Sequence, residues 1–597
     1  MSSAQSQAAC AAPQEYCDIV MKGGITSGVV YPHAICEIAK HYRFHQIGGT
    51  SAGAMAAAAA AAAEYGRRSP AGGFARLSSV PKEVGKDLLS LFHPSPRVAP
   101  LFNMFVGVLR GRGPATRTLL ALAAALKGYW PTTLLGAALG FLIAAGIALL
   151  TGASQTALMV FGVCFALASA LAAIILRVYV ALSKELPKED YGLCTGQSAP
   201  NSKEPAFTDW LAGLIDDLAG RGKGADPLTF GDLKTIAERP VDLRMMTTSL
   251  MERRPYTLPL ERKPETPDFS FERSEWARIF PKKVMDYLIS HCDRVTNVTA
   301  STELSENHVR EFYRFPDPDH LPIVVAARMS LSFPLLVTAV PLWRSDDSAS
   351  KEGQNAKLHR CLFSDGGLSS NFPIHFFDGL LPQKPTFAIS LEEVNEQSDG
   401  FPWMSNLDEK LPRLPVQPFE GLLGFLLRIV DSAKDWQDNL QSLLPGYRER
   451  IVYLGLKPNE GGLNVTMSPG VIADLGQRGA KAGEMLVAQF DGSNARRWNE
   501  HRWRRYLVAQ ARLEETLADM ADRLSKKGAG SWDDFLSPTG YGARPDFYKQ
   551  DGGLFEVLRD RGSKLSALCG KWTDVPSLKA QGDVPKPDTN LRITPKP

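Results

Sequence analysis

The first residue with a chemical signature is Ser51, which stands in a Gly-Thr-Ser-Ala-Gly sequence from Gly49 to Gly53 and fits the pattern G-x-S-x-G. A short apolar run, 44–47, precedes it and an alanine-rich stretch, 52–65, follows it. A serine on a sharp strand-to-helix turn presents its hydroxyl at the sheet edge, where the N-terminus of the next helix can stabilise an oxyanion. The pattern predicts that Ser51 is a nucleophile, and the alternative is a plain glycine turn that caps a helix.

A second glycine turn ends the preceding apolar run, 17–21. Consecutive backbone N–H groups in such a turn can form an oxyanion hole, and parallel strands would bring it to the same sheet edge as the serine turn. A phosphate-binding loop is the alternative, but the turn lacks both G-x-G-x-x-G and the G-K-[ST] ending. The residues predicted to form the oxyanion hole are Gly23, Gly24, Ile25 and Gly28.

A carboxylate at a third strand end supplies a candidate base. Asp365 follows the apolar run 360–364 and is itself followed by Gly366 and Gly367. An aspartate in this position can accept the serine proton directly. The alternative is an Asp-Gly turn of the kind common on protein surfaces. A Ser-His-Asp triad would need a remote histidine such as His501.

The elements that must position these residues begin with a strand, a helix, a strand and a helix. Such a start predicts a three-layer α/β fold with a mainly parallel central sheet. The α/β pattern resumes in the second half of the chain. The strands expected there are 243–248, 323–326, 360–364, 386–391 and 451–456.

The run 131–176 contains no Asp, Glu, Lys, Arg or His. It is long enough for two membrane passes of about 20 residues each, so it predicts a transmembrane hairpin with spans at 132–151 and 156–176. A pair of buried core helices is the alternative. Basic residues flank the run on both sides and the connecting loop is uncharged, which puts both outer ends in the cytoplasm. The flanking basic residues are Arg110, Arg112, Arg117 and Lys127 before the run and Arg177, Lys184 and Lys188 after it.

Composition excludes several classes of function. The chain has 67 Lys plus Arg against 64 Asp plus Glu, and a net charge of +3 over 597 residues disfavours a nucleic-acid binder. The eight cysteines are scattered, without the spacings of a zinc site or the density of a disulfide scaffold. We expect no metal and no cofactor. Residues 1–14 show no secretory signal.

Taken in order, the glycine turn Gly23–Gly28, the serine turn Gly49–Gly53 and the Asp-Gly-Gly of 365–367 resemble the motifs of the patatin-like phospholipases, here of a bacterial type with an inserted transmembrane hairpin. The stretches 227–233 (PLTFGDL) and 326–334 (AARMSLSFP) also resemble family segments. The resemblance implies a patatin-like fold and a Ser-Asp dyad without histidine.

The first glycine turn departs from the family pattern D-G-G-G-x-[RK]-G. Lys22 replaces the leading aspartate, Ile25 replaces the third glycine and Ser27 replaces the basic residue. The turn therefore lacks the basic side chain of the family pattern, although Gly23, Gly24 and Gly28 keep the backbone shape.

The resemblance implies that Asp365 takes the proton of Ser51 as Ser51 attacks an ester, giving an acyl-enzyme that water cleaves. We expect a membrane-anchored lipid acyl hydrolase of the phospholipase A or lysophospholipase type, acting on phospholipid or lysophospholipid in a bilayer. Its location would be a bacterial inner membrane, with two spans and a cytoplasmic catalytic domain. A homo-oligomer, an activating ligand and a partner stay open. The alternatives are a thioesterase or general esterase on the same dyad, or a catalytically silent membrane-anchored scaffold.

These patterns divide the chain into seven parts. They are an N-terminal tail, 1–16; a first hydrolase segment, 17–109; the membrane hairpin with its basic flanks, 110–190; a linker, 191–206; a second hydrolase segment, 207–490; a C-terminal helical extension, 491–576; and a disordered tail, 577–597.

Overall fold

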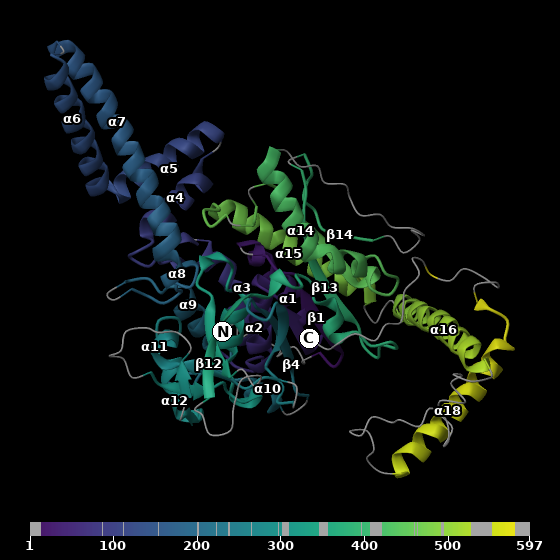
Figure 1. Cartoon of the computed structure of the whole chain (residues 1–597). Coiled ribbons are helices and arrows are strands. Elements are labelled where there is room, and N and C mark those ends of the chain that lie inside the picture. The colour runs from purple at the N-terminus through teal and green to yellow at the C-terminus, as the bar shows by residue number, and fades with distance from the viewer. Residues whose placement is uncertain are drawn as a thin grey trace, which may run out of the picture.

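The structure, a computed structural model, has a sheet-containing body that carries two projections. A helical hairpin formed by α6 (Trp130–Thr151) and α7 (Gln155–Val180) projects from one side, and the helices α16 (Ala495–Ser525) and α18 (Gly552–Thr573) extend from another (Figure 1). The structure describes residues 13–24, 26–85, 88–111, 113–152, 154–199, 202–222, 224–236, 239–263, 266–296, 298–300, 310–345, 356–395, 397–405, 421–458, 460–462, 464–490, 495–526, 552–578 and 585.

Five strands at the centre of the sheet run parallel to one another. In spatial order they are β15 (Ile451–Leu456), β13 (Thr386–Glu393), β1 (Tyr16–Met21), β2 (Arg43–Gly49) and β4 (Asp242–Ser249). Their apolar residues are buried on both faces, as expected of parallel strands that are covered on both sides. The strand-helix-strand start predicted from the sequence forms this part of the sheet.

Beyond β4 the strands pair mostly in antiparallel fashion. β4 pairs with β12 (Ala356–Asp365), and β12 pairs with β11 (Val340–Ser345), which continues to β6 and β9. The remaining strands of this sheet are β5 (Arg254–Leu258), β6 (Phe269–Glu272), β7 (Arg294–Val295), β8 (Val298–Ala300), β9 (Phe312–Arg314) and β14 (Trp403–Met404).

The expected three-layer α/β fold with a mainly parallel central sheet is therefore wrong. Of the twelve strand pairs in the 13-stranded sheet, seven are antiparallel and five are parallel. Only a long crossover can join parallel neighbours, whereas β5 follows β4 after the short turn 250–253 and must run back beside it. The run 323–326, expected as a strand, is the start of the buried helix α13 (Ile323–Ser330).

The helix that follows Ser51, α2 (Ala52–Tyr65), lies at the centre of the helical layer. It packs on β1, β2 and β4 and is itself surrounded by other helices, so nearly all of its side chains are buried. Alanine at almost every position lets the helix approach the strands closely. Its helical neighbours are α1 (Tyr31–Ala39), α3 (Gly73–Val84), α9 (Phe207–Leu218) and α13. Another helix, α15 (Pro469–Phe490), packs on α1 and β15.

The opposite face of the central strands has a smaller apolar cluster. Val20 of β1, Ala388 of β13 and Ile451 of β15 contact Phe372 and Ile374. These two residues belong to the segment that follows Asp365 in the chain. This segment, which ends in the short 3-10 helix Ile374–Phe377, covers the sheet directly behind the serine turn.

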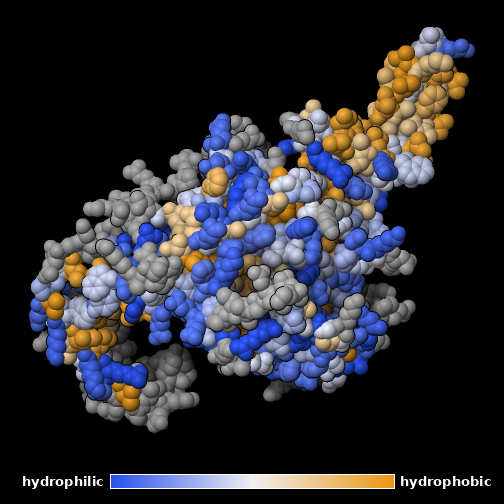
Figure 2. Space-filling view, turned by 180° about the vertical axis from the view of Figure 1, so that it is seen from behind, coloured by the Kyte–Doolittle hydropathy of each residue, from blue (hydrophilic) through white to orange (hydrophobic). Residues whose placement is uncertain are grey.

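The helices α6 and α7 are each long and apolar enough to cross a membrane. Only 11% of the apolar window of each is buried inside the protein, so the alternative of core helices is wrong. They pack through small residues: Gly136, Gly140 and Ala144 form a stripe along α6 that faces α7. Figure 2 shows apolar side chains covering the projecting hairpin, in contrast to the mixed surface of the body.

The hairpin joins the body through further short helices. α4 (Ala99–Arg110) and α5 (Pro114–Gly128) lead into it, and a π-helical turn, Ala181–Glu185, with α8 (Leu186–Lys188) leads out. The segment expected as a linker, 191–206, contains β3 (Gly192–Cys194), which is buried and pairs with β10 (Leu335–Val337). The remaining helices are α10 (Phe230–Lys234), α11 (Arg273–Trp276), α12 (Lys282–His291) and α14 (Gly421–Ser442).

Candidate active site

Ser51 sits between the end of β2 and the first turn of α2 with φ 54° and ψ −127°. A positive φ is uncommon for a residue other than glycine and marks a locally strained backbone. The N–H of Ser51 donates to Oγ of Ser330 at 3.2 Å. The side chain is only 3% exposed. The serine turn therefore has the strand-to-helix geometry that the sequence predicts for a nucleophile.

Gly49 and Gly53 make this turn possible because the backbone approaches itself closely. A Cβ on Gly53 would lie 2.2 Å from the carbonyl oxygen of Met21, and a Cβ on Gly49 would lie 2.3 Å from the carbonyl oxygen of Gly53. No larger residue fits at either position without moving backbone. The two glycines hold the start of α2 against the end of β1.

Asp365 is the last residue of β12 and is 3% exposed. Its Oδ1 accepts a hydrogen bond from the N–H of Gly367 at 2.7 Å, and its own N–H donates to the carbonyl of Ser332 at 3.0 Å. A Cβ on Gly366 would lie 2.0 Å from the carbonyl oxygen of Met246 in β4. The Asp-Gly-Gly turn is thus fixed against the neighbouring strand.

Burial raises the pKa of Asp365 to about 6, while the Ser51 hydroxyl, the N–H of Gly367 and the charge of Lys434 act in the opposite direction. The serine and aspartate turns meet around Asn371: a Cβ on Gly23 would lie 3.2 Å from Cβ of Ser51 and 2.1 Å from Oδ1 of Asn371, and a Cβ on Gly367 would lie 2.8 Å from that same oxygen. Among the described residues, Oδ2 of Asp365 has no hydrogen-bond partner. Catalytic hydrogen bonds often tighten only when substrate is bound. The oxygen left over on Asp365 is a free proton acceptor beside a candidate nucleophile.

The backbone N–H groups of the first glycine turn, expected to form the oxyanion hole, are not all available as donors. The N–H of Gly23 donates to the carbonyl of Asn371 at 2.7 Å and is therefore already used. Within the described part of the chain, the N–H of Gly24 has no acceptor, and Gly24 is partly exposed. Ile25 lies outside the described residues. Gly28 serves packing, since a Cβ there would lie 3.1 Å from Cβ of Ala52.

Asn371 and Asp438 are site residues that the sequence analysis missed. The carbonyl of Asn371 also accepts from the hydroxyl of Thr50 at 2.9 Å, so it ties the glycine turn to the serine turn. Asp438 of α14 accepts from the N–H groups of Asn371 and Phe372 at 2.7 and 2.8 Å and from the hydroxyl of Ser370 at 3.0 Å. Burial raises its pKa to about 6. Nothing local in the sequence marks Asp438, because its partners lie far away along the chain.

The histidine left open by the sequence lies in an aromatic cluster of the C-terminal extension. His501 packs on Phe490 and stacks on Trp498. Burial and nearby arginines lower its pKa well below the usual value. The contacts of His501 thus do not include Ser51 or Asp365. In the part of the chain that the structure describes, no group of three or more His, Cys, Asp and Glu side chains could hold a metal ion.

Comparisons with known proteins show a family but not an activity. No protein-family model matches the chain. A protein of Rhizobium meliloti (strain 1021) named RpoH suppressor is 34% identical over 585 residues, which covers 85% of this chain and 87% of that protein. The crystal structure of VipD from Legionella pneumophila aligns over 94% of this chain and 86% of that chain, with 10% identity and a TM-score of 0.26. A score this low carries no argument about fold or function.

Proposed function

The chain belongs to the family of the RpoH suppressor of Rhizobium meliloti, and we propose that it is a membrane-anchored serine acyl hydrolase that uses Ser51 and Asp365 as a dyad. The name of the relative says nothing about chemistry, so the proposal depends on the site. Its substrates are membrane phospholipids or lysophospholipids. In this proposal the site works in the manner of the patatin-like phospholipases, which its motifs resemble.

The observation that carries the proposal is the buried carboxylate of Asp365 beside a strained serine. With a pKa near 6 the carboxylate is ionised at neutral pH, yet it is basic enough to accept a proton. Asp365 takes the proton of Ser51 as Oγ bonds to the ester carbonyl carbon. The C–O bond to the leaving alcohol then breaks, and Asp365 returns the proton to that oxygen. Water repeats the sequence in reverse and frees the fatty acid and Ser51.

The oxyanion that forms on the carbonyl oxygen needs hydrogen-bond donors that are not already engaged. The N–H of Gly24 meets this condition, and it lies in the turn that packs over the serine: a Cβ on the adjacent Gly23 would lie 3.2 Å from Cβ of Ser51. One such donor contributes about 3–4 kcal/mol to transition-state stabilisation. The N–H of Gly23 would contribute only after releasing the carbonyl of Asn371.

The hairpin supports a lipid substrate. Two helices of membrane-spanning length would hold the body at a bilayer surface, where acyl esters are concentrated. The basic residues on both outer ends of the hairpin favour a cytoplasmic location for those ends and for the catalytic body. Ser51 and Asp365 are both 3% exposed, so a substrate must open the site. Contact with the bilayer or with an activating ligand would supply that opening.

The test is fatty-acid release from phospholipid vesicles by the full-length protein in detergent or liposomes. Wild type is expected to release fatty acid, and Ser51→Ala and Asp365→Asn are expected to abolish release. Ser78→Ala and Asp217→Asn, at exposed positions, are the matched controls and are expected to retain it. Activity on thioesters or short esters alone would favour the thioesterase or esterase alternative. Silence on all of them, with no labelling by a serine-reactive phosphonate, would favour the scaffold alternative.

A further inference from the structure

An apolar pocket lies between the serine helix and the foot of the hairpin. It encloses about 720 Å³ of empty space, part of which is open to solvent. Among the described residues that line it, Thr26 is the only one with a hydroxyl and none is charged. The lining fits a hydrocarbon.

One wall of the pocket is built from the catalytic turns. Thr26 and Gly28 belong to the first glycine turn, and Met55 lies one helical turn beyond Ser51 on α2. Leu331 and Phe333 flank Ser332, whose carbonyl accepts the N–H of Asp365. The pocket therefore touches both of the segments that hold the dyad, although Ser51 and Asp365 are not among its lining residues.

The opposite wall is built from the chain as it enters and leaves the hairpin. This wall includes Val80 and Val84 of α3. It continues with Leu88, Leu91 and Phe92, which lie between α3 and α4. Phe207 and Trp210 of α9 come after the hairpin returns. In Figure 1, α3 and α9 lie in the body beneath α4 and α8. Segments on both sides of the hairpin thus close the pocket.

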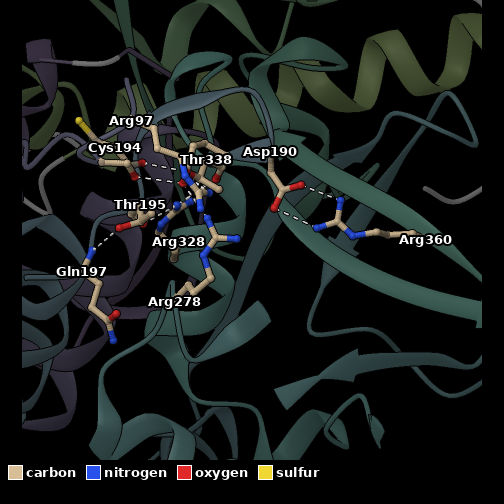
Figure 3. Close-up of polar contacts among 11 residues, drawn as sticks. Arg97, Asp190, Cys194, Thr195, Gln197, Arg278, Arg328, Thr338 and Arg360 are labelled. Carbon is tan, nitrogen blue, oxygen red and sulfur yellow. Dashed lines mark hydrogen bonds and ion pairs between the residues drawn. The ribbon is translucent and has the colours of Figure 1, made fainter. Parts of the chain in front are cut away.

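Polar contacts fix the chain that leaves the hairpin, residues 190–195, to the body (Figure 3). Arg360 of β12 makes two hydrogen bonds to Asp190 at 2.6 and 2.9 Å. The fully buried Arg328 of α13 donates to the carbonyls of Thr195 and Thr338 at 3.0 and 2.9 Å. These bonds link the chain leaving the hairpin to the helix and strand that end beside Ser51 and Asp365. The pocket therefore has a fixed place relative to both the hairpin and the dyad.

We propose that this pocket binds one long acyl chain of a bilayer lipid and places its ester at Ser51. The inference rests on the proposed function and adds the substrate class, a lipid with a long aliphatic chain. An uncharged lining would reject a phosphate headgroup, which must stay outside, because an unpaired charge is costly to bury. Entry at the foot of the hairpin lets the chain pass from the bilayer to the pocket without crossing water.

Hydrolysis of p-nitrophenyl butyrate, octanoate and palmitate by the full-length protein in detergent micelles tests the pocket. In wild type, kcat/KM is expected to rise by about fourfold per added methylene until the pocket is filled. Val84→Trp and Leu88→Trp each put a larger side chain on the wall next to the hairpin and so narrow the pocket. Each is expected to lower kcat/KM for palmitate by at least about tenfold and to leave kcat/KM for butyrate within about twofold of wild type. Leu250→Trp, at an exposed turn, is the control and keeps the wild-type profile.

A second readout does not need hydrolysis. The fluorescent fatty acid parinaric acid is titrated into the Ser51→Ala protein and displaced with palmitate, with and without Val84→Trp. Binding that Val84→Trp weakens by at least about tenfold supports the pocket assignment. Equal loss of butyrate and palmitate hydrolysis, or parinaric acid binding that Val84→Trp does not alter, would overturn it. Binding without any wild-type hydrolysis would support the acyl site and contradict the proposed dyad chemistry.

Discussion

Asp365 and Asp438 are both buried, and burial raises the pKa of each to about 6, yet their surroundings differ. Asp438 accepts three hydrogen bonds, two from backbone N–H groups and one from Ser370. Asp365 accepts one, from Gly367, and its second oxygen has no partner among the described residues. A similar pKa thus accompanies two roles: a carboxylate with filled acceptor sites holds a loop, and one with an empty site can take a proton.

The largest expected effect separates the two aspartates by activity. Asp365→Asn should lower kcat for ester hydrolysis by about 10⁴-fold, since an amide cannot accept the Ser51 proton. Asp438→Asn should lower kcat by no more than about tenfold, because it loosens Asn371 without removing the base. Steady-state assays on one soluble ester measure both. Equal losses in the two variants would break the distinction.

The pH dependence of the reaction should follow Asp365 alone. Protonation below a pKa of about 6 removes the base, so kcat/KM should fall by about tenfold per pH unit below that value and level off above it. Asp438 titrates in the same range, and the Asp438→Asn variant distinguishes the two groups. It should keep the acidic limb of the wild-type profile. Loss of the acidic limb in Asp438→Asn would show that Asp438, and not Asp365, causes it.

The two variants should also differ in their effect on the free energy of unfolding. The folded pKa of Asp365 lies above its ordinary value of 3.8, so ionisation of Asp365 destabilises the fold as pH rises from about 4 to 6, and this cost persists at neutral pH. Asp365→Asn should therefore stabilise the protein at pH 7 by about 1–3 kcal/mol. Ionised Asp438 carries a similar cost, but Asp438→Asn also weakens three hydrogen bonds to the loop, so its gain in stability should be smaller than that of Asp365→Asn by about 1–3 kcal/mol. Thermal unfolding of the two variants beside wild type gives the sign of each change.

The smallest expected effect sharpens the assignment further. The charge of Lys434 lowers the pKa of Asp365. Lys434→Met should therefore move the acidic limb of the pH profile to higher pH by less than about one unit, with little change in the plateau. A shift to lower pH would contradict the placement of this charge near Asp365. The pH profile of kcat/KM for the two proteins measures it.

The sequence predicted the local turns better than the sheet. The serine turn and the Asp-Gly-Gly turn are local patterns, and the close backbone approaches at Gly53 and Gly366 explain why glycine is needed there. The strand expected at 323–326 is helix α13, because a short β-branched run cannot be told from a buried helix by periodicity. The antiparallel half depends on pairing partners that no local pattern specifies.

The finer parts of the site were also beyond local patterns. The sequence could not say that Gly23 donates to Asn371 while Gly24 keeps its N–H free of described acceptors. It could not link Asp438 to Asn371, because 67 residues separate them and only the packing of α14 brings them together.

The measurement that tests the central claim most directly is labelling of the full-length protein with a fluorophosphonate, followed by peptide mass spectrometry at several pH values. The account predicts a covalent adduct on Ser51 that forms faster as pH rises through about 6, and that is lost in Ser51→Ala and strongly slowed in Asp365→Asn. Unchanged labelling of wild type and Asp365→Asn, or an adduct on another serine, would contradict the dyad.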